Sequence, residues 1–203
     1  MKTIRRLLHV TLPLIVLLSM FSLGALSARA DDTRFVPMGI GATFTYNARD
    51  NIGNTWTEKM SVSGFMVIGV AIPPTKAYCE IDTSEGTESE TISMRSTSTS
   101  VYQYAGFGRE YVVWQNSGVG TTWSYTDLKG HTIQRTIEAI ETVTVPAGTY
   151  DGCLRFKNQC ISCADAHPYW YEWVKPGFTM VQWKDYWVDQ NGPVVYKLKS
   201  WTH

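Results

Sequence analysis

Apolar and polar residues alternate with period two over most of the chain after residue 31, and this alternation is the strongest constraint on the fold. Side chains of a strand point alternately to opposite faces of a sheet, so the period is typical of strands with one buried face. No stretch after residue 31 has a clean helical period with capping residues. We predict strands at residues 43–48, 55–63, 65–72, 77–81, 91–95, 101–104, 110–115, 122–126, 131–145, 153–157, 169–174, 179–188 and 194–201.

Turn-forming residues separate these strands. The segments 50–54, 127–130 and 189–193 each contain Gly or Asn, which adopt the positive φ that tight turns require. The polar tract 83–90 is expected to be a loop. Roughly a dozen strands spaced by turns predict an all-β fold. We expect a curved antiparallel sheet that forms an open or partly closed barrel, with one or two short helices at most.

Residues 131–145 allow two interpretations. Ile133, Ile137 and Ile140 have helical spacing, which predicts a helix. The same segment is rich in β-branched Thr and Val residues, which favour a strand. We prefer one long strand and keep the helix as the alternative.

The charge of the chain is balanced, with 18 Lys and Arg against 18 Asp and Glu. Residues 1–30 hold four of the bases and no acid, which leaves 14 bases and 18 acids on residues 31–203, a net charge of −4. A weakly acidic chain without a basic cluster is unsuited to nucleic acid, because phosphate contacts need concentrated Lys and Arg. The apolar content of 44% and the charged content of 18% exclude a disordered, highly charged chain.

The first thirty residues have the form of a secretory signal peptide. A basic start at residues 1–6 is followed by an apolar run at residues 7–26 and by Ala28-Arg29-Ala30, the small-x-small pattern that a signal peptidase cuts. Residues 31–203 then make a single β-rich domain. An uncleaved membrane anchor is the alternative, since a run of about twenty residues can span a bilayer. No later stretch is long and apolar enough, so we expect an exported protein, periplasmic or extracellular, with no transmembrane segment after signal removal.

The segment 143–153 reads Val-Thr-Val-Pro-Ala-Gly-Thr-Tyr-Asp-Gly-Cys. It resembles the Val-Pro-Ala-Gly-Thr-aromatic signature of a group of uncharacterised exported bacterial proteins with a domain of unknown function. In that group a Gly-x-x-Trp-x-Tyr hairpin precedes the signature, as residues 120–125 do here, and a Pro-Gly-hydrophobic segment follows it, similar to residues 175–181. The resemblance implies the open half-barrel of the lipoprotein-carrier superfamily, a curved sheet around an apolar cavity that short helices sometimes plug. It implies no catalytic residues.

Four cysteines, Cys79, Cys153, Cys160 and Cys163, are the next informative feature. An even number of cysteines in an exported chain favours disulfides, and four allow three connectivities. We favour Cys79–Cys153 together with Cys160–Cys163. A bridge from Cys153 to Cys160 or Cys163 across one hairpin is the alternative.

Two other kinds of cysteine chemistry are weaker alternatives. Cys153, Cys160, Cys163 and His167 have the ligand types that Zn²⁺ prefers. The Cys-x-x-Cys pair matches the spacing of a redox motif, although nothing near it resembles the helix start that such a motif needs. Covalent haem attachment is rejected, because Ala164 stands where that motif needs His. Our preferred reading has no metal and no cofactor.

Aromatic residues are concentrated towards the C-terminal end of the chain. We expect five of them to line the concave face of the sheet as a ligand-binding site: Trp123, Tyr171, Trp173, Trp183 and Trp187. Asp185 lies on the same strand face as Trp183 and Trp187. Aromatic rings with a carboxylate between them either stack on sugar rings or line a pocket for an apolar ligand.

The sequence contains no recognisable catalytic motif, neither a Gly-x-Ser-x-Gly elbow nor a His-Glu-x-x-His helix. We therefore expect a non-enzymatic exported envelope protein whose partner is an apolar or amphipathic small molecule or an envelope protein. The second hypothesis is a carbohydrate- or protein-interaction module that uses exposed Trp and Tyr. The third is a cysteine-based redox or zinc protein of the cell envelope.

Overall fold

The alternating stretches form strands that pair into one antiparallel sheet. In this computed structural model the described residues are 34–36, 39–68, 76–85, 88–127, 129–163, 169–187 and 192–202. For several strand residues, Cys79 and Trp187 among them, the description covers the backbone and not the side chain. Within this part of the chain there is no helix, hence none that is long and apolar enough to cross a membrane. The strands are β1 (Thr43–Arg49), β2 (Thr55–Ile68), β3 (Lys76–Glu85), β4 (Glu88–Ser96), β5 (Ser100–Tyr104), β6 (Glu110–Gln115), β7 (Thr122–Thr126), β8 (Thr132–Val145), β9 (Gly148–Cys160), β10 (Tyr169–Val174), β11 (Met180–Trp187) and β12 (Gly192–Thr202).

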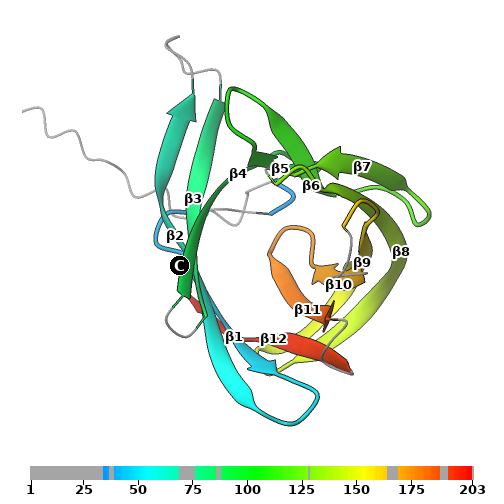
Figure 1. Cartoon of the computed structure of the whole chain (residues 1–203). Helices are drawn as coiled ribbons and strands as arrows, with labels where there is room; N and C mark the ends of the chain where they lie inside the picture. The colour runs from blue at the N-terminus through cyan, green and yellow to red at the C-terminus, as the bar shows by residue number, and fades with distance from the viewer. Residues whose placement is uncertain are drawn as a thin grey trace, which may run out of the picture.

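The order of the strands across the sheet is β6-β5-β4-β3-β2-β1-β12-β11-β10-β9-β8-β7. Neighbours in the sheet are neighbours in the chain except where β1 pairs with β12, so the sheet is a meander joined through its first and last strands. The two edge strands are β6 and β7, which follow each other in the sequence. The sheet rolls up around a central axis, so that these edges approach each other (Figure 1).

The edges meet through side chains and not through a backbone ladder. The indole Nε1 of Trp123 on β7 donates to the carbonyl of Val112 on β6 at 3.0 Å. The rings of Tyr111 and Tyr125 stack across the same seam, with centroids 4.3 Å apart. The expected all-β fold, a curved antiparallel sheet in an open barrel, is confirmed, and the described residues contain none of the short helices that the resemblance allowed.

Residues 132–145 of this segment form the strand β8, so the helical alternative is wrong. The pairing of β8 with β9 shifts register between Ile137 and Ala139 and again between Glu141 and Val143. These β-bulges break the two-residue alternation. Ile140 is exposed, so the helical spacing of the isoleucines did not mark one buried face.

Two other expectations about strand boundaries need correction. Residues 83–85 and 88–90 of the polar tract belong to the paired strands β3 and β4 and not to a loop, because Thr83 pairs with Glu90 and Glu85 with Glu88; residues 86 and 87 lie outside the described residues. The predicted strands 55–63 and 65–72 belong to one strand, β2, which a bulge between Val62 and Gly64 interrupts. Residues 69–72 lie outside the described residues.

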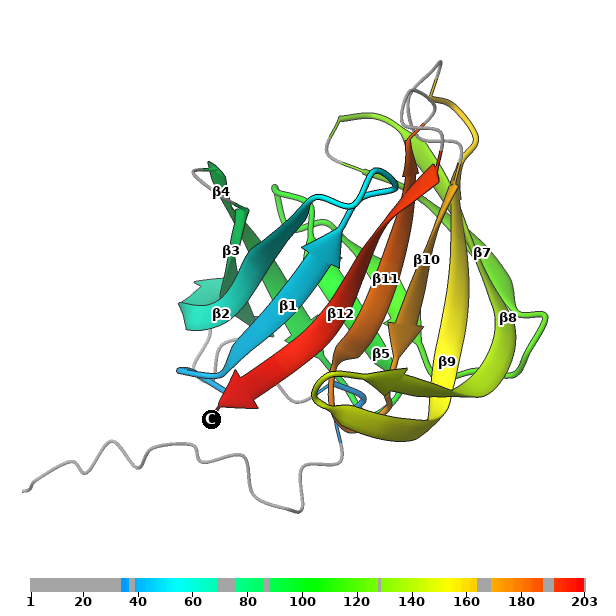
Figure 2. The ribbon, with the colours of Figure 1, turned by 90° about the horizontal axis from the view of Figure 1, so that it is seen from below.

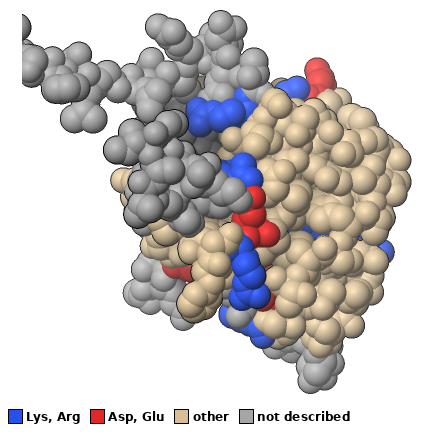
Figure 3. Space-filling model, turned by 90° about the horizontal axis from the view of Figure 1, so that it is seen from above, with Lys and Arg blue, Asp and Glu red and all other residues tan. Residues whose placement is uncertain are grey.

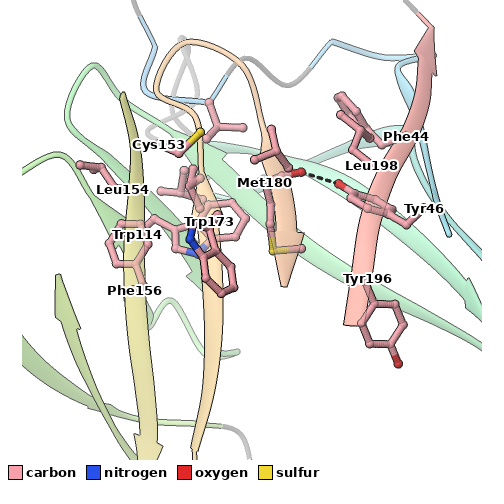
Figure 4. Packing of buried hydrophobic residues seen from close by; sticks show 14 of the residues in the cluster. Phe44, Tyr46, Trp114, Cys153, Leu154, Phe156, Trp173, Met180, Tyr196 and Leu198 are labelled. Atoms are coloured by element: carbon pink, nitrogen blue, oxygen red, sulfur yellow. Dashed lines mark hydrogen bonds between the residues drawn. The ribbon is translucent and has the colours of Figure 1, made fainter. Parts of the chain in front are cut away.

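A cluster of buried side chains fills one end of the roll (Figure 4). Phe156, Leu198, Val181 and Tyr46 are fully buried in it. The hydroxyl of Tyr46 on β1 donates to the carbonyl of Met180 at 2.9 Å, and this bond is drawn in Figure 4. Burial raises the pKa of the Tyr46 phenol, so the hydroxyl stays protonated as a donor.

The signature segment forms the tip of the β8–β9 hairpin. The chain turns at Pro146 and Ala147, and Gly148 follows with φ 139°, a conformation that favours glycine. The hairpin bends past the ends of β10 and β11 (Figure 2), and the backbone N–H of Ala147 donates to the carbonyl of Leu198 on β12 at 3.0 Å. The signature therefore has a structural role, because it fixes the hairpin tip against β12.

Replacing Tyr46 with Phe tests the buried hydrogen bond. Tyr46→Phe keeps the ring but leaves the Met180 carbonyl without this donor, so the free energy of unfolding should fall by about 1 kcal/mol, measured by urea denaturation. Tyr102→Phe is the control, since Tyr102 is only half-buried and its ring lies under Arg95. A loss for Tyr46→Phe no larger than that of the control would contradict the assignment.

Candidate functional site

A cavity of about 610 Å³ lies inside the rolled sheet. Its lining comes from β4, β5 and β6 and from β8 to β11, strands at opposite ends of the sheet order, so the concave face bounds it. Tyr111, Trp170 and Trp183 form the aromatic part of the wall, with Met180 and Ile133 beside them. The rest of the lining is polar, charged or disulfide-bonded: Glu90, Gln103, Asp127, Lys129, His131, Cys160, Cys163, Glu172 and Asp185.

A buried carboxylate in this wall joins the two ends of the sheet. Oε2 of Glu172 on β10 accepts hydrogen bonds from Nε1 of Trp114 on β6 at 2.5 Å and from Nη1 of Arg135 on β8 at 2.8 Å. Oε1 accepts from Nε1 of Trp170 at 2.8 Å. Nη2 of Arg135 donates to the hydroxyl of Tyr125 on β7 at 3.2 Å. Side chains therefore connect β6 to β7, β8 and β10.

The ion pair at the centre of this network is almost completely shielded from solvent. Arg135 is 5% exposed and Glu172 9% exposed. Burial is the largest single effect and opposes the charge on the guanidinium, but the adjacent Glu172 carboxylate and Tyr125 hydroxyl together outweigh it and raise the pKa of Arg135. Each charge depends on the other, because a buried ion without a partner is strongly destabilising.

Two buried polar atoms beside the network have no hydrogen-bond partner within the described part of the chain, namely Nε of Arg135 and Oδ1 of Asn158. Arg135 is opposed to Asn158 across β8 and β9, and Asn158 to Trp170 across β9 and β10. Directly opposed residues share one face of a sheet. Both atoms therefore lie on the concave side, in the row of residues that contains Trp170.

Cross-strand pairs place carboxylates next to indoles in the cavity wall. Trp170 is opposed to Asp185, and Glu172 is opposed to Trp183. Trp183 is also opposed to Tyr196, and these two rings stack with centroids 3.9 Å apart. Each indole of the wall thus has a carboxylate as its neighbour on the adjacent strand, and Trp183 is held in place by its stacking partner.

Of the aromatic residues predicted to line the concave face, the structure brings Trp183 to the cavity. Trp123 lies at the seam, where its ring packs edge-to-face against Phe156 with centroids 6.0 Å apart. It lines a separate groove of about 530 Å³ between the two sheet edges. Trp187 belongs to β11, but its side chain lies outside the described residues.

Tyr171 and Trp173 do not line the cavity: Tyr171 lies on the face of β10 opposite Trp170 and Glu172, and Trp173 is 6% exposed and belongs to the buried cluster. They alternate along the strand with Trp170 and Glu172, whose side chains line the cavity. On the outward face Tyr171 lies under the guanidinium of Arg155, 5.9 Å from the ring centroid. Alternation placed Tyr171 opposite Trp170, but the register shift between Trp173 and Val174 interrupts it at the end of β10, where consecutive residues are buried.

The outward aromatic rings do not form a flat platform. Tyr169 and Tyr171 are inclined at 74° to each other, and Tyr171 and Tyr186 at 76°. Lys157 and Arg155 lie over Tyr169 and Tyr171. Coplanar exposed rings, which would favour a surface carbohydrate site, are therefore absent from this described outer face.

The groove at the seam adjoins the cavity, because Tyr111 and Asp127 line both. β7 presents Thr122, Ser124 and Thr126 outward, all of them exposed and uncharged. Figure 3 views the molecule from above, and there the charged side chains gather mainly in a narrow band beside a broad uncharged area.

The cysteines pair differently from our preferred scheme. Cys160 and Cys163 form a disulfide, whereas Cys153 is a free, buried thiol, so the Cys79–Cys153 bridge is wrong. Five strands separate β3, which contains Cys79, from β9 in the sheet order. The alternative bridges from Cys153 to Cys160 or Cys163 are wrong too, because Cys153 is free and the other two cysteines are bonded to each other.

The disulfide also removes the basis of the zinc hypothesis. A bridged cysteine has no thiolate to offer a metal, so Cys160 and Cys163 are lost as ligands. His167 lies outside the described residues, and within the described ones no group of three potential metal ligands occurs. The Cys160–Cys163 turn is instead fixed to the start of β8, where Ser162 Oγ accepts from the Thr132 backbone N–H at 2.7 Å.

Sequence reasoning missed the residues at the centre of the site. Trp170 and Glu172 were visible as the second face of β10, but Arg135 was hidden among the polar residues of β8, and Asn158 gave no signal of burial. Their importance comes from partners on other strands. Strand order, which alternation does not encode, was needed to find them.

Removing the charge of Glu172 tests the buried network. Glu172→Gln leaves the guanidinium of Arg135 without a counter-ion, so the free energy of unfolding should fall by about 3–5 kcal/mol in urea denaturation. Glu138→Gln is the matched control, because Glu138 pairs with the half-exposed Arg155 at 3.4 Å and should cost under about 1 kcal/mol. Equal losses in the two variants would show that the network does not hold the sheet ends.

The state of each cysteine is directly measurable by alkylation and peptide mass mapping. Burial, with a smaller contribution from nearby acids, raises the pKa of the Cys153 thiol to about 11. Iodoacetamide at pH 8 should therefore leave Cys153 unmodified in the folded protein and modify it after denaturation. The peptide that contains Cys160 and Cys163 should be alkylated only after reduction. Rapid modification of native Cys153 would contradict the packing.

No family model matches the sequence, and a search of curated proteins found no match. Among solved structures, the chain is similar to a Bacteroides fragilis protein described as exported and as having a YmcC-like fold, with a TM-score of 0.56 and 15% identity over 84% of this chain and 99% of that one. It is also similar to a protein from Parabacteroides distasonis described as a lipoprotein, with a TM-score of 0.51 and 16% identity over 83% of this chain and 98% of that one. At this identity the comparisons show the shared fold, and the family suggested by the signature is not shown.

Proposed function

We propose that this protein is an exported, non-enzymatic binding protein that holds an amphipathic small molecule inside its rolled sheet. The observation that carries the proposal is the cavity of about 610 Å³ on the concave face. This volume is within the range of small-molecule sites, which combine apolar walls with a few placed polar groups. The N-terminal segment predicts export, and the two fold neighbours are described as an exported protein and a lipoprotein.

The wall chemistry supports an amphipathic ligand over a purely apolar one. Trp170, Trp183 and Met180 offer apolar surface, whereas Glu172 and Asp185 lie beside them in the same wall. A purely apolar ligand would remove water from the polar and charged side chains of this wall without replacing its hydrogen bonds, which is unfavourable. A ligand with both apolar and polar parts satisfies both kinds of surface.

The two other functional hypotheses have less support. The tilted outward rings of β10 and β11 do not offer a surface platform for sugars. Cys160 and Cys163 are already bridged, and the described residues provide no helix start that would activate either sulfur. Both observations favour the cavity as the functional site.

Filling the cavity should prevent binding. Gln103→Trp adds an indole to the lining, so the affinity for the uncharged fluorescent probe N-phenyl-1-naphthylamine, measured by titration, should fall at least about tenfold, the effect of roughly 1.4 kcal/mol. Val119→Trp is the matched control, because Val119 is exposed and does not line the cavity. Circular dichroism checks that both variants fold. Equal probe affinity in the two folded variants would contradict binding inside the roll.

A further inference from the structure

We infer that the outer face of the sheet carries a phosphate-binding site in a groove that is separate from the cavity. This outer groove has a volume of about 680 Å³ and lies on β1, β2 and β12, with Pro146 of the β8–β9 hairpin tip at its edge. Figure 2 looks onto this face, where the three strands lie side by side. The outer groove shares no lining residue with the cavity, so the inference goes beyond the proposed function and does not rest on it.

Alternation along the strands directs polar side chains into the outer groove. Asn47 and Arg49 are exposed and alternate with buried residues of β1, so both point away from the interior of the roll. Asn47 is directly opposed to Thr57 on β2 and to Lys197 on β12. Directly opposed residues share one face of a sheet. A row of three polar side chains therefore crosses the outer groove, and Arg49 lies beside this row.

The outer groove contains two cations and no carboxylate. Arg49 and Lys197 line it, and both are exposed. Within the described part of the chain the ion pairs involve other side chains and include neither of these two. The two cations belong to adjacent strands, which are about 4.8 Å apart, so their charges repel each other. An anion bound between them replaces this repulsion with attraction.

The acid next to Arg49 in the sequence does not neutralise it. Asp50 is absent from the lining of the outer groove, and its carboxylate is used within its own turn. Oδ1 accepts from the backbone N–H groups of Ile52 and Asn54, and Oδ2 accepts from the side-chain amide of Asn54. The guanidinium of Arg49 thus remains available to a ligand.

The set of donors fits a phosphate group better than a carboxylate. Besides the two cations, the lining offers the amide of Asn47 and the hydroxyls of Thr55 and Thr57. A phosphate monoester has a charge of about −1.5 to −2 at neutral pH and three strong acceptor oxygens, so it can accept from both cations and from the neutral donors together. A carboxylate has one charge and two oxygens. The planar fork of an arginine guanidinium also matches phosphate geometry.

Two further cations flank the outer groove on the same face. Lys59 on β2 and Lys199 on β12 are exposed and alternate with less accessible neighbours, so they point outward as well. Neither lines the groove. The opposite side of the molecule differs, because there acidic side chains lie next to the basic ones in a narrow band (Figure 3). The flanking cations raise the local concentration of anions around the groove.

Calorimetric titration with phenyl phosphate tests the site, with benzoate as the carboxylate of similar size. We expect phenyl phosphate to bind at least tenfold more tightly than benzoate. Lys197→Gln removes a charged donor from the groove, so it should weaken phenyl phosphate binding at least about tenfold. Lys59→Gln is the matched control, because it makes the same charge change on the same face outside the groove, and it should cost less than about threefold.

Both substituted side chains are exposed, so both variants should fold, and circular dichroism checks this. Phenyl phosphate binding that the two variants weaken equally would show a diffuse charge effect and overturn the site. Equal affinities for phenyl phosphate and benzoate would overturn the preference for phosphate.

A second arm separates a soluble phosphate ester from the head group of a lipid. The probes are phosphatidylcholine vesicles with and without phosphatidic acid, which exposes a phosphate monoester, and binding is measured by sedimentation. Vesicle binding that needs both phosphatidic acid and Lys197, without binding of phenyl phosphate, supports a lipid head group. Binding of phenyl phosphate alone supports a soluble ester. Binding in neither arm, or vesicle binding that Lys197→Gln and Lys59→Gln weaken equally, would overturn the inference.

Discussion

The hydrogen-bonded ion pair between Glu172 and Arg135 is the interaction on which the architecture depends. A meander of antiparallel strands leaves two edges, and here no ladder joins them. The Glu172 carboxylate accepts from Trp114 on one edge strand, while Arg135 bonds Tyr125 on the other. The same carboxylate forms part of the cavity wall. The interaction that closes the roll is thus also the one that shapes its interior.

The two ends of the roll have different chemistry, and this difference suits a binding protein. At one end apolar side chains such as Phe156 and Leu198 pack in a buried cluster. At the other end the rows of the sheet carry Asn158, Trp170 and Asp185, so that polar groups alternate with an aromatic ring. The apolar end supplies stability through burial. The polar end leaves room and hydrogen-bonding groups for a ligand.

Local patterns predicted the strands well, because alternation reports directly on which residues share a face. They did not predict which face of β10 points inward. Trp170 and Glu172 occupy one face, Tyr171 and Trp173 the other, and both faces are rich in aromatic rings. The choice is made by partners on β6 and β8, far away in the sequence. The disulfide pairing failed for a similar reason, since Cys79 and Cys153 belong to strands that the sheet order separates.

The central claim is that the ligand binds inside the roll, and a crystal structure of the complex with N-phenyl-1-naphthylamine tests it most directly. We predict electron density for the probe inside the cavity, against the indoles of Trp170 and Trp183. Density on the outward face of β10, over Tyr169 and Tyr171, or a cavity filled by its own side chains, would contradict it.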